Sequence, residues 1–95
     1  MSNRQDYVNK MKAKLDEWNA EIDKLEARAK STQSEMRIKY DEEIENLKKR
    51  RDTAAARLDE LKSAGDNAWE DIKKGVEDAG ESLGNALKSA ASKFK

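Results

Sequence analysis

The sequence contains no cysteine, no histidine and no proline, and each absence removes a class of protein. Without cysteine there is no disulfide framework and no thiolate metal site. Without histidine the usual general base for a serine nucleophile and the Glu-x-x-His ligands of a helical di-iron site are missing. Without proline no helix is forced to break. We therefore expect a non-enzymatic protein with no catalytic, cofactor or metal site and no small-molecule substrate.

Aromatic residues are scarce at 5% of the chain, whereas charged residues make up 42%. Lysine and arginine number 20 and aspartate and glutamate number 20, so the net charge is zero. No field of one sign draws the protein to nucleic acid or anionic lipid. No apolar run approaches the ~20 residues of a membrane-spanning helix, and residues 1–14 lack the apolar core of a signal peptide. We expect a cytoplasmic protein.

An apolar repeat with alternating steps of three and four residues occupies the first part of the chain. Its members are Val8, Met11, Leu15, Trp18, Ile22, Leu25, Ala29, Thr32 and Met36. This spacing is typical of a coiled-coil seam, because it keeps one stripe of a helix facing a neighbouring helix. Acidic residues four positions before basic ones, such as Glu26 before Lys30, add about 0.2–0.5 kcal/mol each to the helix.

A break is predicted at residues 63–67, where Gly65 can end a helix in the left-handed conformation. Asp66 or Asn67 can then cap the next helix, and Asn67 with Glu70 has the spacing of a capping box. Steps of three and four residues resume beyond the break. They connect Trp69, Ile72, Val76, Ala79, Leu83, Leu87, Ala90 and Phe94.

These patterns predict an all-α fold in which residues 1–95 form a single helical coiled-coil domain. The favoured arrangement has one long helix over residues 4–63, a turn near Gly65 and a returning antiparallel helix over residues 67–93, which together form a coiled-coil helical hairpin. The alternative is a three-helix bundle with a second turn at residues 31–34. That segment contains neither glycine nor proline and the seam runs through it unbroken, which favours the continuous helix of about 60 residues, ~90 Å long.

In the long-helix arrangement, the returning helix leaves the first half of the seam uncovered. Burial of an apolar side chain contributes about 1.5–3 kcal/mol, so exposure of this stripe is costly. We expect self-association, as a homodimer or with helices of other proteins. The predicted contact residues are Val8, Met11, Leu15, Trp18, Ile22 and Leu25.

Two other functions remain open from the sequence. Residues 67–95 form an amphipathic face with lysines on other positions, which predicts binding to a membrane surface as the first alternative. The only basic run, Lys48–Arg51, is the basis for weak nucleic-acid binding as the second alternative. Four consecutive helical residues point in all directions and acidic residues flank this run, so nucleic acid is the weakest of the partners considered.

Two segments resemble a known kind of protein. Residues 15–27 (LDEWNAEIDKLEA) and residues 68–77 (AWEDIKKGVE) with Leu83 and Ala86–Ala90 are similar to small bacterial coiled-coil proteins described as hypothetical or as stress-response proteins. The resemblance extends over most of the chain. It implies a bacterial cytoplasmic protein with a stress association, and it implies no catalytic residues.

Overall fold

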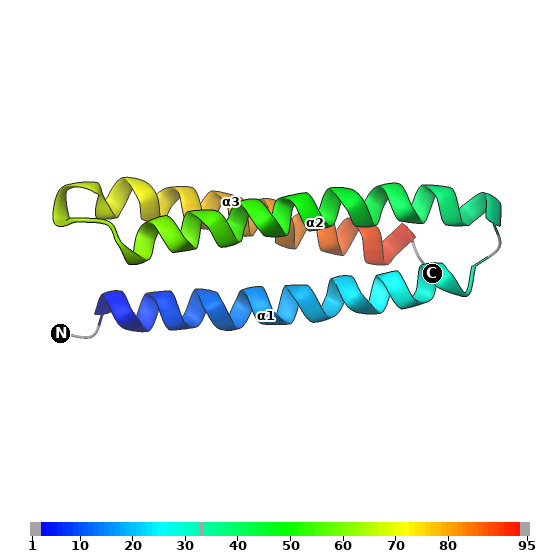
Figure 1. Ribbon diagram of the computed structural model, residues 1–95, viewed down its shortest axis with the longest axis horizontal. Helices are drawn as coiled ribbons and strands as arrows, with labels where there is room; N and C mark the ends of the chain where they lie inside the picture. Colours follow the sequence, from blue (N-terminus) through cyan, green and yellow to red (C-terminus); the bar gives the residue numbers. More distant parts are fainter. Residues whose placement is uncertain (1–2, 33, 94–95) are drawn as a thin grey trace.

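The computed structural model describes residues 3–32 and 34–93, which form three α-helices in an antiparallel up-down-up bundle measuring 51 × 18 × 18 Å. The helices are α1 (Asn3–Lys30), α2 (Ser34–Lys62) and α3 (Asp66–Lys93). Figure 1 shows α2 running back along α1 and α3 running back along α2, so that α1 and α3 point in the same direction. The all-α prediction is confirmed, and the three-helix alternative fits the structure.

The single helix over residues 4–63 is wrong, because the chain reverses after Lys30. Ser31 and Thr32 end α1: both hydroxyls donate hydrogen bonds of 2.9 Å to the carbonyl of Arg28. Their backbone N–H groups bond to the carbonyls of Arg28 and Ala29 in the tighter i to i−3 pattern that commonly closes a helix. The remaining part of the predicted turn, Gln33 and the side chain of Ser34, lies outside the described residues.

The turn near Gly65 is present, but its chemistry differs from the expectation. Gly65 does not have a positive φ, and its carbonyl accepts hydrogen bonds from the N–H groups of Ala68 and Trp69 at 3.1 and 3.0 Å. Gly65 is therefore the residue that caps the start of α3, a position at which glycine is tolerated. Asp66 is already the first helical residue, and the predicted seam residue Phe94 lies outside the described residues.

Two clusters of buried side chains fill the bundle. The cluster beside the α1–α2 turn contains Ile22, Leu25, Ala29, Tyr40, Ile44, Leu47, Leu83, Leu87 and Ala90. The cluster toward the α2–α3 turn contains Val8, Met11, Leu58, Leu61 and Val76. Each cluster draws on all three helices, so the apolar stripe of α1 is covered within its own chain. This intramolecular burial is the physical reason that the bundle replaces the extended hairpin.

Polar contacts between helices lie at the edges of the bundle. Lys48 on α2 donates to Glu26 on α1 at 2.8 Å, and this hydrogen-bonded ion pair raises the pKa of Lys48 and lowers that of Glu26. Lys93 on α3 pairs with Glu43 on α2 at 3.0 Å. Exposed pairs of this kind contribute little to stability and mainly favour one register of the helices over another.

Candidate functional site

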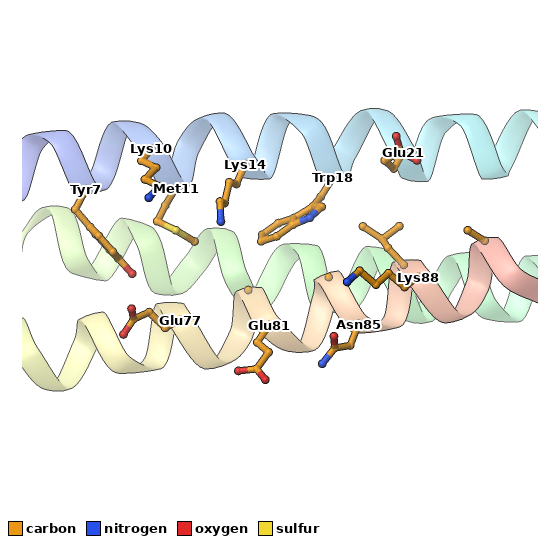
Figure 2. A pocket seen from close by; sticks show the side chains of 14 residues that line it. Tyr7, Lys10, Met11, Lys14, Trp18, Glu21, Glu77, Glu81, Asn85 and Lys88 are labelled. Carbon is orange, nitrogen blue, oxygen red and sulfur yellow. The ribbon is translucent and has the colours of Figure 1, made fainter.

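A groove of about 620 Å³ lies between α1 and α3 and is the candidate site (Figure 2). We call it the α1–α3 groove. From α1 it is lined by Tyr7, Lys10, Met11, Lys14, Trp18 and Glu21. From α3 it is lined by Glu77, Gly80, Glu81, Gly84, Asn85, Leu87, Lys88 and Ala91.

The floor of the groove is apolar and centres on Trp18. Its indole lies against the two glycines of α3: a Cβ added at Gly80 would be 3.2 Å from Cη2, and one at Gly84 would be 3.7 Å from Cζ2. The methyl carbon of Met11 also lies 3.4 Å from the Cβ position at Gly80. Because the glycines have no side chains, the partly buried indole and the buried thioether fill the space between the helices.

Lysines and glutamates form the two lips. Lys10, Lys14 and Glu21 project from α1, and Glu77, Glu81 and Lys88 project from α3 (Figure 2). Among the described residues, no ion pair crosses the groove between these two sets; the one pair that any of them forms is between Glu21 and Lys24 on the same helix. The charges at the lips are therefore free to meet charges on another molecule.

An aromatic cluster closes one end of the groove. The ring of Tyr7 meets that of Trp69 edge to face at 6.3 Å, the guanidinium of Arg4 lies 4.6 Å from the Trp69 ring, and the ammonium of Lys73 lies 5.0 Å from the Tyr7 ring. Arg4 also pairs with Asp66 at 2.8 Å. These contacts fasten the start of α1 to the start of α3.

The hydroxyl of Tyr7 is buried in this cluster without a hydrogen-bond partner among the described residues. Burial, and secondly the negative charge of Glu77, raise the pKa of Tyr7 above its ordinary value of 10.0. An unpaired buried hydroxyl is uncommon and unfavourable.

The six residues of the predicted self-association seam all lie on the inner side of α1. Val8, Met11, Ile22 and Leu25 are buried, with exposed fractions of 8% or less, while Leu15 and Trp18 are partly buried against both clusters. The expectation that this stripe is uncovered in a single chain is thus wrong. Only Met11 and Trp18 of the six line the α1–α3 groove. Self-association itself stays a prediction.

The basic run on α2 is occupied by contacts within the chain. Lys48 pairs with Glu26, Arg50 donates to the hydroxyl of Ser82, and Arg51 donates to the side-chain oxygen of Asn19 at 2.8 Å and pairs with Asp52. The structure therefore directs Lys48, Arg50 and Arg51 toward four different neighbours. It does not gather them into one basic patch.

The amphipathic face of α3 is also used within the bundle. Val76, Leu83, Leu87 and Ala90 are buried there, with exposed fractions of 7% or less. Binding of residues 67–95 to a membrane surface would require this face to leave the core, and residues 94 and 95 lie outside the described part of the chain. Within residues 3–32 and 34–93, no helix combines the length and the apolar character that crossing a bilayer requires.

The groove was not foreseen from the sequence, although a signal for it exists. Gly80 and Gly84 are one helical turn apart on the face of α3 that carries the apolar seam. Such a pair permits close approach of a bulky side chain. The lone large aromatic residue of the seam on α1, Trp18, is the side chain that fills the space.

In the described part of the chain, no group of three or more acidic side chains is arranged to hold a metal ion. No family model, no curated protein and no solved structure matches the chain. The α1–α3 groove, with its apolar floor and charged lips, is therefore the feature from which a function is inferred.

Proposed function

We propose that this protein is a non-enzymatic interaction protein that binds a helix of another protein molecule in the α1–α3 groove. The observation that carries the proposal is the groove itself: Trp18 lies on Gly80 and Gly84, and Met11 on Gly80, between lips whose charges form no ion pair across the groove within the described part of the chain. An apolar floor binds the apolar face of a helix, and the charged residues at the lips pair with charged residues beside that face.

The dimensions of the groove match a short amphipathic helix. It extends along α1 from Tyr7 to Glu21 and along α3 from Glu77 to Ala91, which at the rise of an α-helix is about 21 Å, or four turns. A helix of this length presents three or four apolar side chains on one face. Trp18 provides the central contact, because partly buried tryptophans are among the side chains that most often dominate binding energy.

The stress association rests on the sequence resemblance alone and stays a prediction. A helix-binding groove is compatible with it, because proteins that cover exposed apolar segments limit aggregation of unfolded chains. Binding to lipid or nucleic acid is less well supported, since the surfaces that these functions need are engaged within the bundle.

Site-specific photo-crosslinking in the native cell tests the proposal. The photoreactive residue p-benzoylphenylalanine is placed at Asn85, which is exposed at the groove, and at Ala56, which is exposed on α2 outside it, as the matched control. We expect adducts of the Asn85 protein whose peptides map to a helical segment of a protein molecule. If Asn85 yields no more adducts than Ala56, the groove is not a binding site.

Equal helix content of the two labelled proteins, measured by circular dichroism, ensures that the comparison concerns the surface and not folding. A second labelled position, Ala91, lies in the same groove and is expected to give the same adducts as Asn85. Adducts that differ between Asn85 and Ala91 would indicate random collisions and would count against the proposal.

A further inference from the structure

The two lips of the α1–α3 groove carry the same charge spacing with opposite signs. Their charged residues are Lys10, Lys14 and Glu21 on α1, and Glu77, Glu81 and Lys88 on α3. In both sets the intervals are four and seven residues. Read in the direction of the chain, α1 is positive, positive and negative, and α3 is negative, negative and positive.

The two sets also lie at corresponding levels of the bundle. α1 and α3 run in the same direction (Figure 1). Tyr7 lies close enough to Glu77 for that charge to raise its pKa, and Trp18 lies against Gly80 and Gly84. Each charge on one lip therefore has an opposite charge on the other lip roughly opposite it, yet the described residues form no ion pair across the groove.

We infer that the other protein molecule is a second copy of this chain, docked groove to groove about a two-fold axis parallel to the helices, so that the helices of each copy lie along the lips of the other copy's groove and not inside it. This rotation places α1 of one copy against α3 of the other at the same level. Lys10, Lys14 and Glu21 then face Glu77, Glu81 and Lys88 of the second copy, and the symmetry repeats all three pairs. The inference rests on the proposed function.

Self-complementarity is what distinguishes a second copy from an unrelated partner. A symmetric interface uses the same surface twice, so that surface must attract itself. Three lysines and three glutamates give the lips no net charge, whereas a groove for an acidic or basic partner would carry an excess of one sign. An unrelated helix gives no reason for the equal spacing of the two lips.

The size of the surface suits a reversible dimer. The charged lips extend for about 21 Å along a bundle that is 51 Å long and 18 Å wide, so the contact covers about 380 Å², less than the ~800 Å² per partner of a standard stable interface. Its apolar centre is confined to the groove floor around Trp18 and Met11, and the charged lips surround that centre.

A pair of charge-reversal variants tests this arrangement. In the first, Lys10→Glu, Lys14→Glu and Glu21→Lys reverse the α1 lip; in the second, Glu77→Lys, Glu81→Lys and Lys88→Glu reverse the α3 lip. The two lips of each variant then carry identical patterns, so each variant repels itself. An equimolar mixture restores opposite patterns at both contacts. We expect a wild-type dimer in sedimentation equilibrium, at least tenfold weaker dimers for each variant alone, and a heterodimer of wild-type strength in the mixture.

Three results would overturn the inference: a wild type that stays monomeric at several hundred micromolar, a variant that dimerises as well as the wild type, or a mixture that fails to associate although both variants have wild-type helix content. If a triple variant does not fold, the single changes Lys14→Glu and Glu81→Lys are mixed in the same way, with the same expected rescue and the same overturning results. If the wild type is monomeric and Asn85 forms adducts with a different protein, the dimer is ruled out and the proposed function of the groove still stands.

Discussion

The indole of Trp18 and the backbone of Gly80 meet so closely that a Cβ at position 80 would lie 3.2 Å from Cη2 of the ring. One turn further along α3, Gly84 leaves more room, since its Cβ would lie 3.7 Å from Cζ2. The half-ångström difference separates a contact that forces a neighbour to move from an ordinary van der Waals contact. It gives the two glycines different roles in the floor of the groove.

We expect Gly84→Ala to raise the free energy of unfolding by about 0.5–1 kcal/mol, because alanine is favoured over glycine inside a helix and the new methyl group fits against the indole. Gly80→Ala should raise the free energy of unfolding by less, since the ring of Trp18 must shift to admit the methyl group. Urea denaturation measures both values, and Gly75→Ala, whose Cβ would lie 3.8 Å from Cδ of Arg57, is the matched control for helix propensity. A Gly80→Ala protein at least as stable as Gly84→Ala would contradict this difference.

Trp18 joins the two core clusters, since it packs against both. We expect Trp18→Ala to lower the free energy of unfolding by about 2–4 kcal/mol, because a large aromatic side chain leaves a cavity that the helices cannot fill. Ile38, with an exposed fraction of 65%, is the control, and Ile38→Ala should change stability by no more than about 0.5 kcal/mol. Similar losses for the two variants would mean that Trp18 does not bridge the clusters.

Tyr7 should make the protein sensitive to alkaline pH. Its pKa is raised in the folded state by burial and by Glu77, so the unfolded chain loses the phenolic proton first and stability falls as the pH rises above about 10. We expect Tyr7→Phe to be stable at pH 7, because the hydroxyl has no hydrogen-bond partner to lose among the described residues, and to lose less stability between pH 9 and 11 than the wild type. Thermal unfolding across this range measures the effect, and parallel curves for the two proteins would refute it.

The Glu26–Lys48 pair should stabilise the folded state at neutral pH and lose this contribution at acidic pH. The hydrogen bond and the charge of Lys48 lower the pKa of Glu26 in the folded state, so its contribution is complete above the ordinary pKa of 4.5 and is lost as the pH falls through the lower folded value. We expect Glu26→Gln to be slightly less stable than the wild type at pH 7 and equal to it near pH 2. Glu17→Gln, an exposed change on the same helix, is the control and should show no such convergence.

The helical segments of this protein could be predicted from the sequence, whereas the turn at residues 31–34 could be given only as the alternative to a continuous helix. The steps of three and four residues identify the helical segments, and Gly65 marks the turn between α2 and α3. Residues 31–34 contain no comparable signal, because the seam continues from Ala29 through Thr32 to Met36 as it would in one helix. The turn there depends on a tertiary effect: Ile22 and Leu25 are buried against Tyr40 and Ile44 only if the chain reverses.

The groove could not be predicted from the sequence for a related reason. Trp18 was placed on the apolar seam of the first helix, in a stretch predicted to be uncovered in a single chain, and the sequence does not say which helix it faces. Once α1 folds back beside α3, the indole lies against Gly80 and Gly84, and the charged residues on either side become the lips. Spacing along one helix can be read from the sequence, whereas the juxtaposition of two helices separated by a third requires the fold.

The two tryptophans of this chain give it separate optical reporters. Trp18 lies in the middle of the bundle, in the groove, whereas Trp69 lies at one end beneath the guanidinium of Arg4. Replacing one by phenylalanine leaves the emission of the other as a local signal. Fraying of the terminal turns would change the Trp69 signal alone, and occupancy of the groove would be seen first at Trp18, so motion and binding can be followed independently without an added label.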